Sequence, residues 1–383
     1  MKALIIAGII CILSAHGITT HAQELVLDAQ ETVKARVIEV LEAKTRVVPG
    51  TDTKTDFQTL RAEMLDGTKA GAIVTIDNDF LTLEEGDTFY LLHTTHAIDG
   101  REFYSVLEPY RTPWLAVFVT LFILCVLIFG GWQGARGLIS LGASLLFIFY
   151  LLLPGMLAGY SPILVSLMVA SLIIILGSYI THGFNKTTTA AVFGMLITIL
   201  ITGVLAYVAV NVTKLTGFAS EEAVYLNFNT RGALNFSGLL LGGILIGLLG
   251  VLYDAAISQA ISVEELHRVG PHLPRRFILK RAMRIGREHI GALVDTLAIA
   301  YVGAALPLLL LFYASDTPIL LTLNREIFAV EIVRTMIGGI GLMLTVPITT
   351  LVAAWMLTPK TVATDLTNIQ KEREAVEHVE HHH

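Results

Sequence analysis

Charged residues are scarce in this sequence: Asp, Glu, Lys and Arg make up 15% of its 383 residues, whereas 54% of the residues are hydrophobic. Because a soluble globular protein carries about a quarter charged residues, long segments of this chain must be shielded from water. The shortage begins after about residue 112, and the part before it has ordinary polarity. The sequence therefore predicts an N-terminal part that faces water and a C-terminal part that faces lipid.

Cysteine is also scarce, with two residues, Cys11 and Cys125, that both lie in apolar stretches. This excludes a disulfide framework and a thiolate metal site. The charged tail 359–383 ends in three histidines, His381 to His383. A metal-binding tract is one interpretation of these histidines, but a solvated end or a piece of a purification tag explains them better. We therefore expect neither a metal nor a cofactor.

The N-terminus has the order of residues that is typical of a secretory signal. Lys2 precedes a short apolar run over 3–13, and small residues precede a cut after Ala22. An uncleaved membrane anchor is the alternative, but the run is shorter than the roughly 20 apolar residues that cross a bilayer. We predict a cleaved signal peptide over 1–22.

Residues 23–111 alternate between apolar and polar side chains with the period of β-strands. Val33, Ala35 and Val37 share one face, and the apolar positions then slip by one residue, which predicts a bulged, bent strand. Further strands are predicted over 57–64, 72–76, 88–93 and 103–107, with turn residues at 66–67 and 85–87. Five short strands favour a small all-β domain of OB-like fold, a partly open barrel, with a β-sandwich as the alternative. Acidic residues outnumber basic ones here, so we expect no nucleic acid partner.

Seven long apolar runs follow in residues 112–358, and each is long enough to cross a hydrocarbon core of about 30 Å. They lie at about 114–131, 137–153, 162–180, 188–210, 234–253, 290–313 and 330–356. We therefore predict a membrane all-α bundle of about seven transmembrane helices, with the lipid bilayer as its surroundings.

Basic residues are distributed unevenly over the connections between these helices. Arg136, Lys186, the cluster at 268–287 and the tail after Lys360 fall on one side, and few basic residues fall on the other. Because cytoplasmic loops are rich in Lys and Arg, the β domain is predicted to be extracytoplasmic, as the signal peptide also requires. The predicted location is the cytoplasmic membrane of a bacterium, as a multi-pass protein.

The fifth predicted helix carries small and polar residues on a single face. They are Gly243, Gly247, Gly250, Asp254 and Ser258, at spacings of three or four residues, with Gln259 beside them. The glycines predict a close helix–helix contact, because small residues let two backbones approach in lipid. Asp254 is a candidate substrate or ion site, because an acid in the membrane is costly unless it has a function. The alternative is an acid at the headgroup boundary that reaches water or pairs with Arg284 or Arg287.

The sixth predicted helix adds Asp295 and Thr296 to the candidate site residues and Gly303 to the packing residues. Since the two helices are antiparallel, Asp254 and Asp295 are expected at a similar depth, where they either meet or flank one cavity. The connection 262–287 is predicted to be a loop, because glycine and proline interrupt it at 270–274. Its basic stripe either binds anionic lipid or signals topology, and we favour the topology signal.

Three short motifs resemble those of the YibE/F-like membrane proteins of bacteria: GVLYDAAIS at 250–258, GREHIG at 286–291 and DTLAIAYVG at 295–303. The resemblance implies a multi-pass membrane protein with a β domain before this helix set, and it assigns no biochemical activity. It marks these motif positions: Asp254, Ser258, Gly286, Arg287, Gly291, Thr296 and Gly303. The family pattern has an asparagine at the position of Asp295, which argues against a mechanism that needs two carboxylates.

The candidate residues favour a transporter with a polar site between the fifth and sixth helices. Glycine-broken helices, an acid at their end, and Pro307 and Pro347 in later helices are typical of transporters. An envelope scaffold or sensor, whose outer domain docks a partner, is the alternative. An intramembrane aspartyl protease is disfavoured because the glycine-aspartate signature is missing around Asp295, so we expect no enzyme. A second copy of the chain or a paired membrane subunit is the expected partner.

Overall fold

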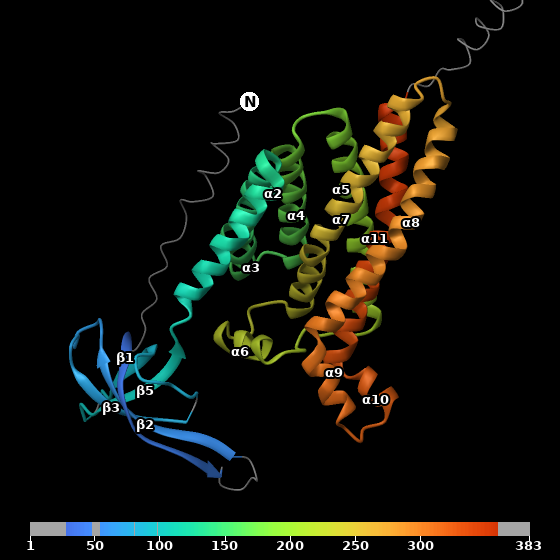
Figure 1. The fold of residues 1–383 in the computed structure, drawn as a ribbon. Coiled ribbons are helices and arrows are strands. Elements are labelled where there is room, and N and C mark those ends of the chain that lie inside the picture. Colours follow the sequence, from blue (N-terminus) through green and yellow to red (C-terminus); the bar gives the residue numbers. More distant parts are fainter. Residues whose placement is uncertain (1–27, 48–53, 80, 98, 359–383) are drawn as a thin grey trace, which may run out of the picture. The chain divides into compact units, whose positions relative to one another are not determined.

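The computed structural model describes residues 28–47, 54–79, 81–97 and 99–358 (Figure 1). The chain divides into two compact units, Met1–Leu121 and Phe122–His383. The predicted signal peptide over 1–22 and the tail 359–383, with its three terminal histidines, lie outside the described residues.

The first unit contains a five-stranded antiparallel sheet in the order β3-β2-β1-β4-β5 (Figure 1). The strands are β1 (Ala29–Val47), β2 (Lys54–Met64), β3 (Ile73–Asn78), β4 (Thr88–Thr95) and β5 (Glu102–Pro109). All five predicted strands are confirmed. The strand β1 lies in the middle of the sheet and pairs with both β2 and β4.

The bend of the sheet comes from β1. Its register against β2 shifts at two places, after Val37 and after Val40. These shifts confirm the predicted slip after Val37, because an extra residue in one strand bends it. The bent sheet forms a half-barrel around a buried core that includes Val33, Leu60 and Phe89.

The remainder of the described chain is mainly helical. Its helices are α2 (Thr112–Phe147), α3 (Leu153–Leu157), α4 (Pro162–His182), α5 (Lys186–Val212), α6 (Glu221–Asn229), α7 (Phe236–Val269), α8 (Arg275–Ala304), α9 (Leu306–Tyr313), α10 (Ile319–Asn324) and α11 (Glu326–Leu357), with a short π-helix at Ile148–Leu152. In the described ranges five helical segments are long and apolar enough to cross a membrane, or six if α8 and α9, bent by 67°, count as one span. The chain is therefore a membrane protein with several apolar helices, as predicted, although this count does not reach seven.

The helix α2 is broken at Gly131, whose φ of 53° and ψ of -137° are not helical. In a straight helix, residues eight positions apart lie about 12 Å apart along the axis. Gly134, however, approaches Val126 so closely that a Cβ atom at Gly134 would lie 2.4 Å from the Val126 carbonyl oxygen. The chain therefore turns back on itself at Gly131, which separates the predicted helices 114–131 and 137–153.

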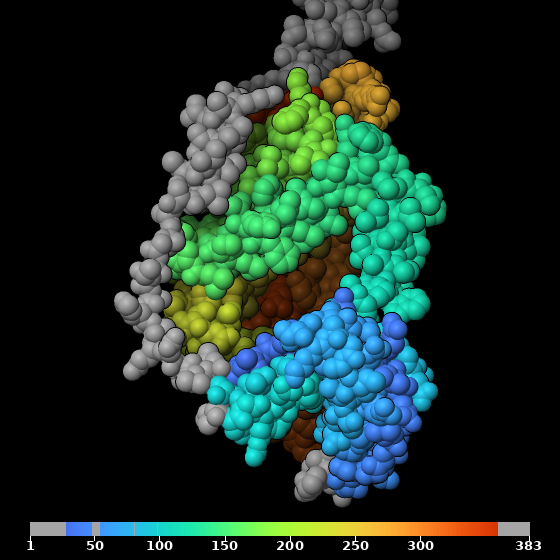
Figure 2. All heavy atoms as spheres, turned by 90° about the vertical axis from the view of Figure 1, so that its left-hand side faces the viewer, coloured from blue at the N-terminus to red at the C-terminus, as the bar shows by residue number. Residues whose placement is uncertain are grey.

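The side chains of α2 lie on the surface. None of its residues is buried, and Figure 2 shows its atoms, in teal, along the outside. Phe118, Phe122 and Phe129 are among its exposed large side chains. An apolar exposed surface of this kind is typical of a helix that faces lipid.

The predicted loop 262–287 is wrong. The helix α7 continues to Val269 and α8 begins at Arg275, so only residues 270–274 form the turn. With 34 residues, α7 is about 51 Å long, whereas the hydrocarbon core is about 30 Å thick. Polar helix ends that extend beyond the membrane therefore account for the charges that suggested a loop.

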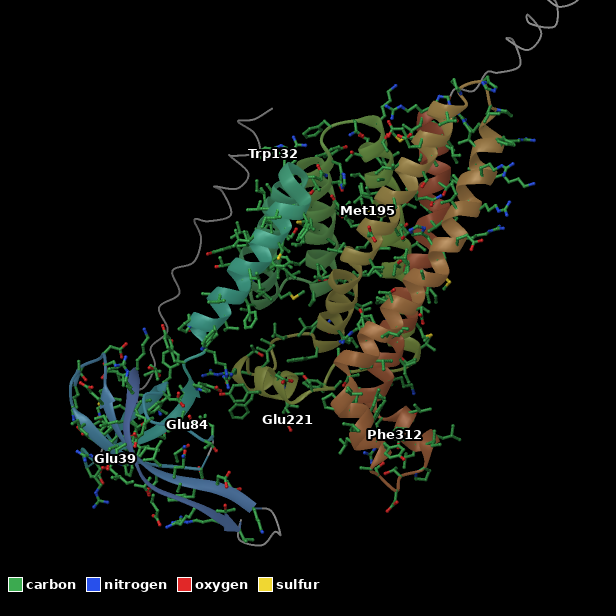
Figure 3. All side chains as sticks on the ribbon, viewed as in Figure 1. Glu39, Glu84, Trp132, Met195, Glu221 and Phe312 are labelled. Atoms are coloured by element: carbon green, nitrogen blue, oxygen red, sulfur yellow. The ribbon has the colours of Figure 1, made fainter. Side chains whose placement is uncertain are left out.

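The helices of the bundle approach most closely at buried glycines. A Cβ atom at Gly194 of α5 would lie 2.3 Å from Thr349 Oγ1 of α11, and one at Gly242 of α7 would lie 2.4 Å from Ser166 Oγ of α4. Met195, labelled in Figure 3, is fully buried next to Gly194. Because close helix contacts in lipid depend on small residues, these glycines hold the bundle together.

Candidate functional site

The residues predicted to form a packing stripe lie on an exposed face of α7. Gly243, Gly247, Gly250, Asp254 and Ser258 are all exposed, and we call them the small-residue face of α7. Within the described parts of the chain, a Cβ atom at Gly243, Gly250 or Gly303 would meet nothing within 4 Å. The predicted helix–helix contact of these glycines is therefore not observed within the described part of this chain.

The predicted packing stripe of α7 differs from the stripe that α7 buries by a shift of one residue around the helix. The stripe that α7 buries is the neighbouring one, which includes Gly242, Leu245, Leu249 and Leu252. Adjacent residues are separated by about 100° around a helix of 3.6 residues per turn. Both stripes consist largely of small or apolar residues, so periodicity alone did not reveal which one faces the bundle.

Asp254 lies at a small pocket between α7 and α8. The pocket is lined by Asp254, Ser258, Gln259, Ser262, Ile285, His289 and Leu293, together with Val346 of α11. Its volume of about 20 Å³ has room for about one water molecule. Asp254 forms no ion pair with any described residue, so the alternative pairing with Arg284 or Arg287 is not observed. We call this the Asp254 pocket.

Asp295 and Thr296 do not belong to the Asp254 pocket. Asp295 follows His289 by six residues, which places it about 240° further around α8. Both Asp295 and Thr296 are exposed, and the Thr296 hydroxyl donates a hydrogen bond of 2.8 Å to the Ala292 carbonyl of its own helix. The structure thus brings Asp254, Ser258 and Gln259 together and leaves the two α8 candidates on a different face.

Gln259 connects three helices. Its side chain is buried, and its amide donates hydrogen bonds of 2.8 Å to the Ala282 carbonyl of α8 and 2.7 Å to Thr350 Oγ1 of α11. A Cβ atom at Gly286 would lie 2.8 Å from Gln259 Oε1, so the absence of a side chain at Gly286 makes room for this arrangement. Gln259 therefore positions the pocket wall rather than presenting a free amide to it.

A larger cavity lies at the other end of the small-residue face. It has a volume of about 650 Å³, and its lining includes Glu222 of α6, Gly243 of α7, Tyr301 of α8, and Glu331 and Arg334 of α11. Glu331 and Arg334 are half-buried and form an ion pair, with 2.8 Å between Oε1 and Nη1. Sequence reasoning did not single out Glu331, and it counted Arg334, near the start of the last predicted helix, only among the few basic residues on the outer side. Two opposite charges three residues apart near the start of an apolar run were the available signal. We call this the Glu331 cavity.

The small-residue face of α7 connects the two sites. Gly243 lines the Glu331 cavity and Asp254 lines the Asp254 pocket, with about 16 Å of helix between them. Between these ends, the Tyr301 hydroxyl lies 3.5 Å from the Cβ position of Gly247. Carboxylates near both ends can bind a cation or a proton. In the ranges that the structure describes, no group of three or more His, Cys, Asp or Glu side chains could hold a metal ion.

The sheet of the first unit has a polar cluster of its own. His93 is buried, stacks on Tyr104 with 4.8 Å between ring centroids, and lies between Glu31 and Glu102, with N to O distances of 3.9 and 3.8 Å. The side chain and backbone of Thr68 donate hydrogen bonds that hold the pKa of Glu31 below its ordinary value. Hydrogen bonds from Lys69 and Tyr104 lower the pKa of Glu102 in the same way. These contacts join β1, β4 and β5 to the turn that follows β2.

The sequence profile of the YibE/F-like protein family matches residues 118–359, which is more than half of the chain. The chain belongs to this family. The resemblance predicted from the three motifs is thereby confirmed. Comparisons with curated proteins and with solved structures found no match. In this YibE/F-like protein the matched segment contains the small-residue face of α7, the Asp254 pocket and the Glu331 cavity, whereas the five-stranded sheet precedes it.

Proposed function

We propose that this YibE/F-like protein is a transporter that moves a small cation, or a solute coupled to a proton, along the small-residue face of α7. One observation carries the proposal: Asp254, which forms no ion pair with a described residue, lies near one end of this face, and an ion pair lines a cavity of about 650 Å³ at the other end. Ionisable groups are costly inside a membrane, and where they occur they commonly mark transport pathways.

The two ends of this face suit the binding of different species. The Glu331 cavity is large enough for a small solute, and its charged pair can orient a polar group. The Asp254 pocket has room for about one water molecule, which suits a bare cation or a proton bound to the carboxylate. Because the face between them is exposed in the single chain, a second copy or a paired membrane subunit is the partner that we expect to cover it.

The proposed membrane topology has seven spans. The break at Gly131 divides α2 into two spans, the bent pair α8–α9 forms one, and α4, α5, α7 and α11 supply four more. The basic residues Arg136, Lys186 and Arg275 then fall at one end of the helical unit, where Figure 1 shows the turns before α5 and α8. By the positive-inside rule this end is cytoplasmic, so the sheet lies outside the cytoplasmic membrane and the predicted signal peptide directs it there.

The outer domain has an OB-like fold in this proposal. The half-barrel has its two edges at β3 and β5, and pairing of these edges would complete a five-stranded barrel. An exposed strand edge can also accept a strand from a partner protein. This feature supports the alternative function, an envelope scaffold or sensor whose outer domain docks a partner.

The experiment that separates the two functions is complementation of a deletion strain in a growth screen across ions and pH. Asp254→Asn keeps the size of the side chain and removes its charge, so it should abolish complementation while membrane insertion and thermal stability stay unchanged. Asp295→Asn is the matched control, because it removes another exposed carboxylate, on a different face, and should complement fully. Full complementation by Asp254→Asn would exclude a charged transport site and leave the scaffold or sensor as the function.

A further inference from the structure

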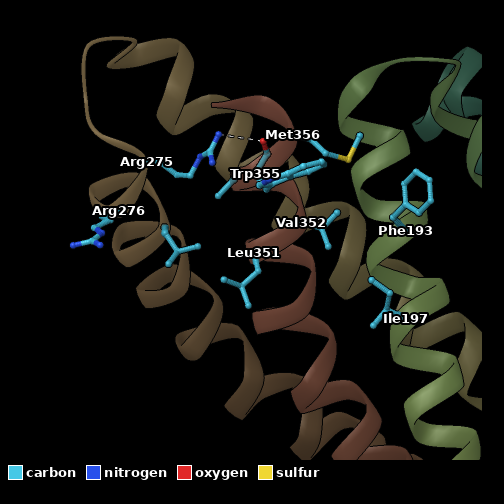
Figure 4. A pocket seen from close by; sticks show the side chains of 10 residues that line it. Phe193, Ile197, Arg275, Arg276, Leu351, Val352, Trp355 and Met356 are labelled. Carbon is cyan, nitrogen blue, oxygen red and sulfur yellow. Dashed lines mark hydrogen bonds between the residues drawn. The ribbon is translucent and has the colours of Figure 1, made fainter. Parts of the chain in front are cut away.

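A second cavity of about 650 Å³ lies along α11 near the end of that helix, with α5 and α8 on its two sides (Figure 4). Its floor and one side are apolar and include Leu351 and Trp355 of α11, and Phe193 and Ile197 of α5. All four side chains are exposed. We call this cavity the arginine-rimmed groove, because Arg275 and Arg276 are its charged lining residues.

The two arginines differ in their contacts. Arg275 is held in place: its Nε donates a hydrogen bond of 2.9 Å to Thr358 Oγ1, and its guanidinium also donates to the Thr358 carbonyl. A further hydrogen bond to the Trp355 carbonyl is drawn in Figure 4. Arg275 thereby satisfies the last carbonyls of α11 and offsets the negative end of that helix. Arg276 is exposed, makes no hydrogen bond or ion pair with a described residue, and extends away from the floor in Figure 4. Its charge is therefore available to a ligand.

The surroundings of the groove are positive. The helix α8 begins at the groove, at Arg275, so its N-terminus adds partial positive charge. Lys280 lies one helical turn after Arg276 and is exposed. No acidic residue occurs in 183–198, 270–287 or 340–358, the segments that enclose the groove. A ligand with a negative end and a long apolar part matches this distribution.

We propose that the arginine-rimmed groove binds an anionic phospholipid, with an acyl chain along Ile197 and Leu351 and the headgroup phosphate at Arg276 and Lys280. The apolar floor distinguishes a phospholipid from free phosphate. It contributes nothing to the binding of phosphate, whereas it buries the acyl chain of a lipid whose headgroup contacts the basic rim. Trp355, at the end of α11, is the kind of residue that lies at the membrane interface beside lipid headgroups.

The test uses the purified full chain in detergent, with phosphatidylglycerol and phosphatidylcholine of identical acyl chains, read by native mass spectrometry and by thermal unfolding. Phosphatidylglycerol should be retained and should raise the melting temperature more than phosphatidylcholine. The variant R276Q/K280Q should bind phosphatidylglycerol about thirtyfold more weakly, because each basic residue near an anionic surface contributes about a fivefold factor in affinity and the two factors multiply. The control R281Q/R284Q removes the same charge from the same helix and should bind normally.

A second variant tests the apolar half of the groove. Ile197→Trp fills the floor of the groove without changing its charge, so this variant should no longer retain phosphatidylglycerol in preference to phosphatidylcholine. Adding inorganic phosphate should not restore that preference. Equal stabilisation by both lipids, or equal losses in R276Q/K280Q and R281Q/R284Q, would overturn the proposal in favour of general charge attraction. Stabilisation by inorganic phosphate alone would reassign the rim to a free anion. If the protein binds phosphatidylglycerol selectively only after residues 360–383 are deleted, the tail and not lipid occupies the groove of the full chain, and the proposal is overturned.

Discussion

Gly286 of α8 is a position where a single methyl group has a clear predicted effect. A Cβ atom there would lie 2.3 Å from Val346 Cγ1 of α11 and 2.8 Å from Gln259 Oε1 of α7. Both distances are below 3.0 Å, which real Cβ contacts essentially never show, so a neighbour must move. Gln259 is restrained, because its amide already bonds Ala282 and Thr350. Gly286→Ala should therefore disturb the junction of three helices.

The change in the free energy of unfolding has two destabilising contributions and one stabilising contribution. Overpacking a closely packed core costs about 1–3 kcal/mol. Weakening one hydrogen bond of Gln259 adds about 0.6 kcal/mol, the average measured between membrane helices. The higher helix propensity of alanine offsets about 1 kcal/mol. Gly286→Ala should therefore lower the free energy of unfolding by roughly 0.6–2.6 kcal/mol.

The assay is unfolding of the purified protein in mixed detergent micelles, with Gly291→Ala as the matched control. Gly291 lies on the same helix, and its Cβ position is open, so alanine there should stabilise the protein by up to about 1 kcal/mol. Combining Gly286→Ala with Gln259→Ala should cost less than the sum of the two, because one of the clashing atoms is gone. If the Gly286→Ala protein proves as stable as the Gly291→Ala protein, the reasoning about this junction is refuted.

The topology can be tested with single cysteines in a Cys125→Ser background. A cysteine at position 79 should react with a membrane-impermeant thiol reagent in intact cells, whereas one at position 274 should react only after the membrane is opened. Labelling of position 274 in intact cells would overturn the proposed topology. Residues 23–111 expressed alone should form a soluble β-rich fragment, which a helical or disordered circular dichroism spectrum would contradict. This fragment should become progressively less stable as the pH falls below 4.5, because the lowered pKa values of Glu31 and Glu102 give a stabilisation that is complete above their ordinary pKa of 4.5 and is lost as the pH falls through the lower pKa of the folded state. Thr68→Val removes the main hydrogen-bond donor to Glu31, so thermal unfolding should depend less on acid in that variant, and an unchanged dependence would contradict the assignment.

Much of the fold was predictable because the patterns involved are local. An apolar run of about 20 residues predicts a transmembrane helix, and apolar–polar alternation with period two predicts a β-strand. The slip after Val37 even located a bulge in β1. The loop 262–287 was mispredicted because glycine and proline at 270–274 mark a turn but do not show how far helices extend on either side.

The candidate site was predictable only in part. The spacing of Asp254 and Ser258 correctly placed them on one face, and Gln259, predicted beside them, lines the same pocket. Asp295 was grouped with them by depth alone, and the helical phase of α8 separates it. Arg334 was counted only as a basic residue in the topology argument, because its partner Glu331, three residues away, had not been considered with it.

By itself, the sequence determined that this chain has a water-facing β domain and apolar helices that carry scattered acids and glycines, because composition and periodicity are properties of each segment alone. Only the tertiary structure decided which glycines pack. Gly242 and Gly243 are adjacent and chemically identical, yet one meets Ser166 of α4 and the other faces outward into the Glu331 cavity. The difference is a rotation of about 100° around α7, and it is set by the neighbouring helices, whose positions depend on residues far away in the chain.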